Sequence, residues 1–391
     1  MKLSTITNPK FYKTAAKMLL VLPIAALMHR KHSDVWLVAE RPNQARDNGY
    51  CFYKYLRTAH PEIEAYYVID KNAKDREKLE AYGNLIDFDS WKHYLYFCLS
   101  EIHISAHDDM CAPKSAPIIR LLRKRQGYQN VFLPHGVSYG ISEFCLAKYG
   151  KFDLFICSGK PEYDNVLANY GYSAEQVAYT GFPRLDGWHD IQADKHQILL
   201  MPTWRAYLAQ NPNTVFEETA YYHAFQALIS HRALAELLQK HDLKLVFYLH
   251  NDMQKYAKAF QTDCENIEIV YSDETYDIQE LLKSSALLIT DYSSVHFDFA
   301  YMGKPVIYYQ FDREEFFEKQ YRRGMFDAAA DGFGPVADDE NALIEAIGRA
   351  AESGFIVEEE YNARMHNFYQ LYDQNNCERV YQTIREKKWL K

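Results

Sequence analysis

Short apolar runs alternate with longer amphipathic stretches along most of this 391-residue chain. Apolar runs separated by helical stretches are typical of strands that are buried on both faces of a parallel sheet. One series of such runs lies between residues 34 and 180, and a second lies between residues 197 and 309. The pattern therefore predicts an α/β fold with two doubly wound, Rossmann-like domains.

The predicted domain boundaries follow from where these two series begin and end. A chain of this length exceeds the size at which one hydrophobic core usually divides. We predict a basic and apolar N-terminal segment at residues 1–33, an N-terminal domain at 34–190, a C-terminal domain at 191–360 and a helical closing segment at 361–391.

The N-terminal segment contains an apolar stretch, Met18–Met28, with lysines before it and His29, Arg30 and Lys31 after it. These 11 residues include Pro23 and are too few for a membrane-spanning helix, which needs about 20. The pattern favours a segment that lies in the membrane interface, and a first helix packed on the domain is the alternative. The scattered cysteines, without CxxC spacing, are typical of reduced thiols. We expect a cytoplasmic protein, peripheral on the inner face of the cell membrane.

Composition and missing motifs exclude several classes of function. The net charge of −9 argues against nucleic acid as the main partner. The chain has no GxxxxGK(S/T) loop, no GxGxxG after a strand and no HExxH helix, which argues against P-loop, classical dinucleotide and zincin sites. The nearest candidate for a metal-binding acidic pair is Asp108 with Asp109, which is more typical of a solvated loop. We therefore predict no metal and no cofactor, with protein side chains neutralising the charge of a phosphate.

The most informative stretch of the sequence runs from Leu287 to Tyr309. A buried strand to Thr290 is followed by Asp291, Ser293 and Ser294, then by a short helix and by a second strand. Either serine is a good helix N-cap. Main-chain N–H groups, hydroxyls and the helix dipole at this turn favour a phosphate, although a capped helix without a ligand is the structural alternative.

Polar motifs follow several other predicted strands, and ligands of parallel sheets bind beyond the carboxyl ends of strands. His135 and Gly136 follow one strand, and a histidine of near-neutral pKa can accept a proton from an attacking hydroxyl. Thr203 and Arg205 follow another, a pairing suited to phosphate oxygens, and His250 follows a third. Each motif alone is more often structural. Together they predict a site for a phosphorylated ligand.

In this order the motifs resemble those of the CDP-glycerol glycerophosphotransferase family, which makes teichoic-acid and capsule polymers. The resemblance extends from about residue 34 to about residue 385. Its landmarks are Glu40 with Arg46–Gly49, His135–Gly136, Gly181–Asp186, Pro202–Arg205, His250 and Ile289–Asp298.

The resemblance implies two facing domains of the GT-B arrangement with the active site between them. It implies transfer of glycerol phosphate from CDP-glycerol to a hydroxyl of a lipid-linked or polymeric acceptor, with release of CMP. His135 would be the general base, and His250 would stabilise the phosphate under attack. The implied donor ligands are Thr203, Arg205, Asp291, Ser293 and Ser294, and the implied acceptor-side or supporting residues are Glu40, Asp47, Asn48, Gly136 and Arg184.

Alternatives remain open from the residues alone. CDP-ribitol presents the same diphosphate as CDP-glycerol, and a GT-B glycosyltransferase would use a nucleotide sugar on the same fold. A binding subunit of a capsule assembly complex would have no activity. Proline usually follows the second histidine in the family, whereas Asn251 follows His250 here. The length leaves no room for the extra domain of larger family members, so we expect a short, single-module member.

Overall fold

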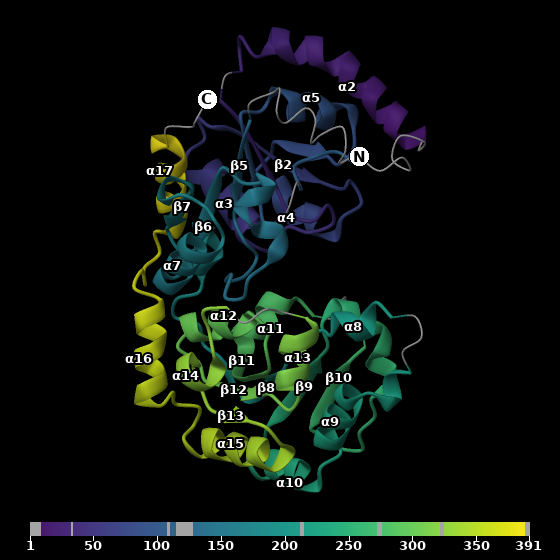
Figure 1. Cartoon of the computed structure of the whole chain (residues 1–391), viewed down its shortest axis with the longest axis vertical. Coiled ribbons are helices and arrows are strands. Elements are labelled where there is room, and N and C mark those ends of the chain that lie inside the picture. The colour runs from purple at the N-terminus through teal and green to yellow at the C-terminus, as the bar shows by residue number, and fades with distance from the viewer. Residues whose placement is uncertain are drawn as a thin grey trace. The chain divides into compact units, whose positions relative to one another are not determined.

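The computed structural model describes residues 9–32, 34–107, 110–114, 128–211, 215–271, 276–320 and 324–387 (Figure 1). They form two compact units. Unit 1 takes its residues from the ranges 1–135, 143–187 and 371–391, and unit 2 from 136–142 and 188–370. After Gly187 the chain remains in unit 2 as far as Gln370. The predicted closing segment, 361–391, is divided between the two units.

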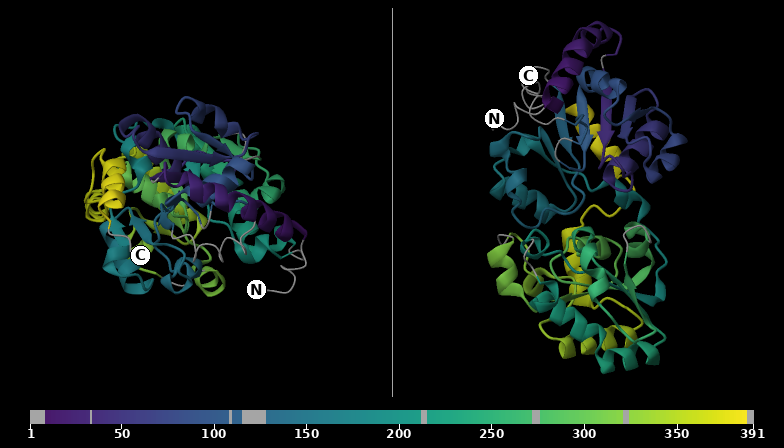
Figure 2. Two further views of the ribbon diagram at one scale, coloured as in Figure 1. Left: turned by 90° about the horizontal axis from the view of Figure 1, so that it is seen from above. Right: turned by 90° about the vertical axis from the view of Figure 1, so that its right-hand side faces the viewer.

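Unit 1 is built on a seven-stranded parallel sheet in the order β3-β2-β1-β4-β5-β6-β7. Its strands are β1 (Val35–Ala39), β2 (Glu64–Ile69), β3 (Leu85–Asp87), β4 (Ile102–Ser105), β5 (Gln129–Phe132), β6 (Leu154–Cys157) and β7 (Val177–Tyr179). Its α-helices are α2 (Pro9–Met28), α3 (Asn48–Ala59), α4 (Glu77–Glu80), α5 (Trp91–Leu99), α7 (Lys160–Asn169) and α17 (Asn376–Glu386). The long helix α2 packs on α5 at the outside of this unit (Figures 1 and 2).

Unit 2 is built on a six-stranded parallel sheet in the order β10-β9-β8-β11-β12-β13. Its strands are β8 (Asp194–Leu200), β9 (Lys244–Tyr248), β10 (Ile267–Val270), β11 (Ser285–Thr290), β12 (Val306–Tyr309) and β13 (Val336–Ala337). Its α-helices are α8 (Ala206–Ala209), α9 (Ala220–Ile229), α10 (Arg232–Lys240), α11 (Ile278–Ser284), α12 (Val295–Tyr301), α13 (Arg313–Lys319), α14 (Ala328–Asp331), α15 (Glu340–Glu352) and α16 (Glu359–Phe368). The predicted class, two doubly wound α/β domains, is confirmed.

Each sheet has a switch point at which the strand order reverses. In unit 1 the chain runs outward from β1 to β3, then returns to β4 and runs outward to β7 on the other side. In unit 2 the corresponding neighbours are β8 and β11. Ligands of doubly wound sheets bind in the crevice beyond the carboxyl ends of the two strands at the switch point. The polar residues that follow β1, β4, β8 and β11 are therefore the candidates for ligand binding.

The apolar strands hold these polar residues in place. In unit 2, Ile198, Leu245, Phe247, Leu287 and Ile289 have no solvent exposure and belong to one hydrophobic cluster. Core packing of this density permits little displacement of a strand. Each strand therefore delivers the residue after its last apolar position to a fixed place at the edge of the sheet.

Candidate active site

The turn after β11 is tied to the loop after β8 by the carboxylate of Asp291, which is 1% exposed. One of its oxygens accepts hydrogen bonds from the main-chain N–H groups of Thr203 (2.7 Å) and Tyr292 (2.5 Å). The hydroxyl of Thr290 adds a hydrogen bond to the carbonyl oxygen of Met201 (2.7 Å). The two strands at the switch point are thus joined beyond the end of their ladder.

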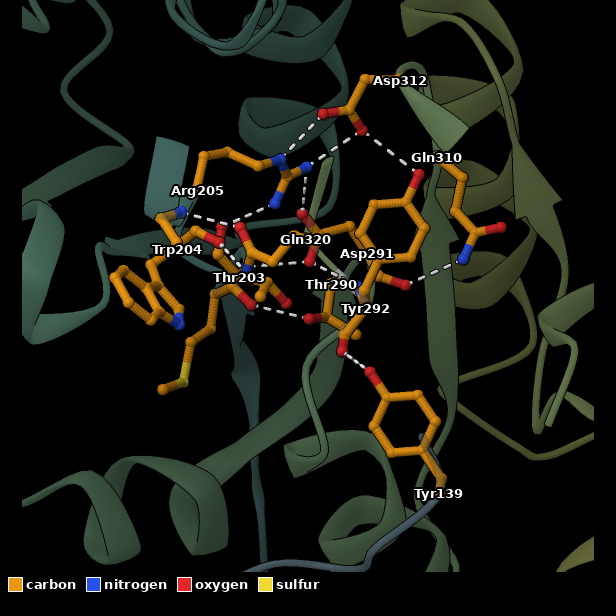
Figure 3. A network of polar contacts seen from close by, with 12 residues as sticks. Tyr139, Thr203, Trp204, Arg205, Thr290, Asp291, Tyr292, Gln310, Asp312 and Gln320 are labelled. Carbon is orange, nitrogen blue, oxygen red and sulfur yellow. Dashed lines mark hydrogen bonds and ion pairs between the residues drawn. The ribbon is translucent and has the colours of Figure 1, made fainter. Parts of the chain in front are cut away.

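Arg205 completes this connection from a fully buried position (Figure 3). Its guanidinium donates to Asp291 Oδ2 (2.9 Å), to both carboxylate oxygens of Asp312 (2.8 and 3.0 Å) and to the carbonyl oxygen of Thr203 (2.8 Å). Burial acts to lower the pKa of Arg205, but the two carboxylates outweigh it and raise that pKa above its ordinary value. Arg205 therefore acts as a permanently charged clamp on the Asp291 turn, and its direct contact with a donor stays a prediction.

Further side chains brace the clamp, as Figure 3 shows. The Tyr292 hydroxyl donates to Asp312 Oδ1 (3.2 Å), and the amide of Gln310 donates to the carbonyl oxygen of Asp291 (3.0 Å). Gln320 bridges the loop after β8, and the hydroxyl of Tyr139 donates to the carbonyl oxygen of Tyr292. Buried polar networks in which every member has a partner make a site rigid.

Ser293 and Ser294 lie on this rigid turn and are partly exposed. Ser294 has the N-cap position of α12, but its side chain makes no capping hydrogen bond. Gly136 approaches the same serine closely, because a Cβ on that glycine would lie 2.6 Å from Ser294 Oγ. The turn therefore presents two hydroxyls that the helix does not use.

His250 and Trp204 follow the neighbouring strands β9 and β8, and their rings stack with centroids 5.8 Å apart. The Nδ1 atom of His250 accepts the main-chain N–H of Asp252 (3.2 Å) and so caps the short 3-10 helix Asn251–Ala259. That bond fixes which edge of the imidazole is turned away from the chain. Thr203, in the same loop as Trp204, has a buried Oγ1 with no hydrogen-bond partner among the described residues.

In unit 1, Glu40 follows β1 and is 3% exposed. Its carboxylate accepts main-chain N–H groups of Arg46 (2.8 Å), Asp47 (3.0 Å) and Tyr50 (2.7 Å). Burial, with the charge of Asp47, raises the pKa of Glu40 to about 7 against the three amides, which act to lower it. Gly49 leaves room for this side chain, since a Cβ there would lie 3.0 Å from Glu40 Cγ. Glu40 thus shapes the loop that begins α3.

Arg184, which is 3% exposed, fixes the other side of that loop. Its guanidinium donates to Asp47 (2.8 Å), and its main-chain N–H donates to the side chain of Asn48 (3.1 Å). The amide of Asn48 in turn donates to the carbonyl oxygen of Pro134 (2.6 Å). The four predicted supporting residues of unit 1 therefore form one connected arrangement that leads to His135.

His135 follows β5, and its ring stacks on that of His107, which follows β4. The ring centroids are 4.7 Å apart, and the planes differ by 3°. Surrounding protein lowers the pKa of His135, with Asp47 opposing and Arg184 and Arg41 assisting, although the side chain keeps contact with solvent. Burial, His135 and Arg41 lower the pKa of His107 to about 3. At neutral pH both imidazoles are thus mainly neutral.

The structure collects the predicted residues at two edges. The edge of unit 2 carries Gly136, Thr203, Arg205, His250, Asp291, Ser293 and Ser294. The edge of unit 1 carries Glu40, Asp47, Asn48, His135 and Arg184. Sequence reasoning missed His107 and Asp312, although each follows a strand of the two predicted series. Asp108 and Asp109 lie outside the described residues. Within the described ranges no three His, Cys, Asp or Glu side chains are grouped as a metal site would require.

Two doubly wound units with polar residues at both switch points place the chain in the GT-B-like class of two-domain proteins. A family model described as CDP-Glycerol:Poly(glycerophosphate) glycerophosphotransferase matches residues 20–386. The chain belongs to this family, and the resemblance noted from its motifs is confirmed.

Two relatives illustrate the similarity. The Minor teichoic acid biosynthesis protein GgaB of Bacillus subtilis is 31% identical over 388 residues, which are 96% of this chain and 42% of GgaB. The Teichoic acid poly(ribitol-phosphate) polymerase of Bacillus spizizenii is 27% identical over 304 residues, which are 69% of this chain and 43% of that polymerase. The chain thus spans less than half the length of each.

Solved structures of the Wall Teichoic Acid Polymerase TagF share the fold. One has a TM-score of 0.68 at 17% identity and covers 98% of this chain and 95% of that chain. Another is a variant soaked with CDPG, which has a TM-score of 0.67 at 16% identity and covers 99% of this chain and 98% of its own. This likeness confirms the predicted GT-B-like fold.

Proposed function

We propose that this protein transfers glycerol phosphate from CDP-glycerol to a hydroxyl of a polymeric or lipid-linked acceptor in teichoic-acid synthesis, with release of CMP. The observation that carries the proposal is the Asp291 turn, which Arg205 and Asp312 clamp while Ser293 and Ser294 keep unused hydroxyls. Family membership and the CDPG-soaked TagF structure support the donor.

In this proposal Ser293 and Ser294 donate to the diphosphate of the donor at the switch point of unit 2. His135 accepts the proton of the acceptor hydroxyl as that oxygen attacks the β-phosphorus. The bond to the CMP oxygen then breaks, and CMP leaves. His250 donates to the phosphoryl oxygens from Nε2, because its Nδ1 accepts the main-chain N–H of Asp252. Arg205 holds the turn in place, so that little reorganisation accompanies the reaction.

Ribitol phosphate is the second candidate for the transferred group. The relative from Bacillus spizizenii is named as a ribitol-phosphate polymerase, and both donors share the CDP moiety. Ser293 and Ser294 would bind either donor, because they contact the diphosphate. The residues that contact the polyol determine which of the two donors is used.

The test is acceptor-dependent CMP release by the purified protein, with CDP-glycerol, CDP-ribitol and a nucleotide sugar as donors. Turnover of one CDP-polyol that falls by about 10²–10⁴-fold in His135→Ala supports the proposal. The matched control is His366→Ala, an exposed histidine of α16 in unit 2, which should keep full activity. Turnover of the sugar donor alone would make the protein a glycosyltransferase. An active His135→Ala variant would remove the proposed base.

No metal takes part in the proposed reaction. The hydroxyls of the Asp291 turn, His250 and main-chain N–H groups supply the positive ends of dipoles that a diphosphate needs. Full CMP release after dialysis against EDTA is the expected result. Loss of activity that Mg²⁺ restores would contradict this part of the proposal.

We also propose that α2 binds the inner surface of the cell membrane. No described helix is both long and apolar enough to cross a bilayer. The buried face of α2 packs on unit 1 through Met18, Val21 and Ala25, while Leu20 and Leu27 are 62% and 69% exposed on the opposite face. A long helix with an exposed apolar face and basic residues nearby is suited to the membrane interface.

Sedimentation with vesicles that contain anionic lipid tests the role of α2. The double substitution of Leu20 and Leu27 by Glu should release the full-length protein into the supernatant without loss of CMP release from a soluble acceptor. Ile356→Glu, a change at a residue 73% exposed in unit 2, is the matched control and should sediment with the vesicles. Unchanged sedimentation of the double variant would refute the role of α2.

A further inference from the structure

Arg41 stands at the switch point of unit 1, together with His107 and His135. Ala39, the last residue of β1, pairs with Ser105 of β4, and Ser105 pairs with Phe132 of β5. Arg41 lies two residues after Ala39, and His107 lies two residues after Ser105. His135 lies three residues after Phe132. These side chains therefore leave three consecutive strands at similar heights above the carboxyl edge.

The charged side chains at this edge differ in whether another group of the protein already binds them. Asp47 is paired with Arg184 (2.8 Å), and the carboxylate of Glu40 is buried against three main-chain N–H groups. Arg41 is exposed, and no ion pair or side-chain hydrogen bond joins it to another described residue. Of these four charged side chains, Arg41 is thus the one whose charge is left for a ligand.

The imidazole pair adds polar surface without adding charge. His107 has a buried Nδ1 with no partner in the described part of the chain, which suits a neutral ring that serves as a stacking platform for His135. Among described groups, the charges that face His135 are Asp47, Arg184 and Arg41, and the ring that faces it is His107. Two stacked imidazoles 4.7 Å apart cannot readily both be protonated. The pair therefore takes up one proton at a time.

We propose that Arg41, beside the stacked His107 and His135, binds a phosphate group of the acceptor and so selects a phosphorylated polyol chain as substrate. This inference rests on the proposed function, which makes His135 the base for the acceptor hydroxyl. Arg41 holds the phosphate next to the hydroxyl that attacks. The acceptor is thereby recognised through the phosphate groups of its own repeating units. The planar guanidinium suits this task, because it donates two parallel hydrogen bonds to a phosphate.

The phosphate also assists the proton transfer. Before the acceptor binds, Arg41 acts to lower the pKa of both imidazoles, which keeps His135 in the neutral form that can accept a proton. A bound phosphate anion offsets that charge. It then stabilises the imidazolium that forms as His135 takes the hydroxyl proton, since an opposite charge nearby favours the charged form. The acceptor itself thus strengthens the base that activates it.

The binding test uses NMR titration of the histidine rings in the full-length protein, which requires no turnover. The probes are sn-glycerol 3-phosphate, glycerol and inorganic phosphate. We expect glycerol 3-phosphate to raise the pKa of His135 in the wild type and in Arg41→Lys, and to have no effect in Arg41→Gln. Glycerol should have no effect on any of them. Lys54→Gln removes an exposed charge elsewhere in unit 1 and should respond as the wild type does.

Steady-state kinetics separates acceptor from donor. Arg41→Gln should raise the KM for a phosphorylated acceptor by about tenfold or more, the loss typical of one charged hydrogen-bonded contact, and leave the KM for the CDP-polyol unchanged. Arg41→Lys should restore most of the affinity. A raised donor KM with an unchanged acceptor KM would assign Arg41 to the donor and overturn the inference.

The NMR outcomes decide the inference even if no CDP-polyol is turned over. A response to glycerol 3-phosphate that survives in Arg41→Gln would overturn it, as would an equal response to glycerol. Inorganic phosphate that binds as tightly as glycerol 3-phosphate would show a general anion site and overturn the assignment to a polyol chain. Failure of the proposed function would instead appear as absent CMP release with the Arg41-dependent response intact.

Discussion

Replacing Arg205 by Met should loosen the switch point of unit 2 while nearly conserving side-chain volume. The guanidinium makes hydrogen bonds of 2.8–3.0 Å to Asp291, Asp312 and the carbonyl oxygen of Thr203. Methionine fills much of the same space but leaves two carboxylates buried without their cation. The substitution therefore tests the charge of the clamp more than its packing.

The magnitude follows from the burial of all three charges. Arg205 is completely buried, and the side chains of Asp291 and Asp312 are 0% and 4% exposed. Removing one partner from a buried ionic cluster typically costs about 3–5 kcal/mol, because the remaining charge keeps its desolvation penalty. At about 1.4 kcal/mol per factor of ten, local opening should become roughly 10²–10⁴ times more frequent. Lower pH should reduce the loss, because a proton can neutralise an unpaired carboxylate.

Hydrogen exchange with mass spectrometry is the suitable assay, because unfolding of a protein with two units is not a two-state process. Peptides that contain β8 and β11 should lose protection in Arg205→Met, while peptides from the sheet of unit 1 keep theirs. The control is Arg232→Met, which removes an exposed arginine paired with Glu236 on α10. That variant should match the wild type. Protection of β8 and β11 within tenfold of the wild type in Arg205→Met would refute the clamp.

Two further perturbations address the turn after β11 and the opposite end of the same strand. Ser293→Ala and Ser294→Ala should each raise the KM for the CDP-polyol by about tenfold, the loss typical of a hydrogen bond to a charged group, with an unchanged acceptor KM. Ser353→Ala, at an exposed serine after α15, should change neither, and unaltered donor kinetics in both serine variants would contradict the diphosphate role. Lys304 donates to three carbonyl oxygens at the end of α11, and burial lowers its pKa to about 7. Because an unfolded lysine has a pKa of about 10.4, stability should rise with pH between about 7 and 10, and Lys304→Met should abolish that rise in Tm. If the Tm of Lys304→Met rises between pH 7 and pH 9.5 as much as the Tm of the wild type does, this expectation is wrong.

The sequence allowed the strands and the Asp291 turn to be predicted because both depend on local pattern. The second strand predicted within Leu287–Tyr309 is observed at Val306–Tyr309, since its buried apolar run is flanked by clear helix and loop signals. A helical closing segment was predicted at 361–391. This part of the chain contains most of α16 and the whole of α17. The first main-chain N–H groups of α17 donate to Asp186 in unit 1, a contact between residues far apart in the sequence that local pattern cannot predict.

Pairings between strands could not be predicted from local pattern. Asp312 lies at the end of β12, and it meets Arg205 because β12 lies next to β11 in the sheet. The same strand-end rule that selected Asp291 would have selected Asp312, but not its partner. His107 was missed for a related reason. Its role in the site depends on the stack with His135, which requires β4 and β5 to be neighbours. The serines were expected to cap α12, whereas Ser294 makes no side-chain cap.

Glu40 offers a test of how burial competes with hydrogen bonding next to Arg41. Its pKa, raised to about 7, lies above the value of about 4.3 for an unfolded glutamate. The folded state therefore retains this proton more strongly. The contribution of protonated Glu40 to the free energy of unfolding is complete below about pH 4 and is lost as pH rises through 7. The free energy of unfolding of the wild type relative to Glu40→Gln should fall by about 4 kcal/mol across that window, at 1.36 kcal/mol per pKa unit. Protection factors of α3 amides, corrected for intrinsic exchange, measure this difference. A difference that does not change with pH would show that the three main-chain N–H groups prevail over burial and hold Glu40 ionised.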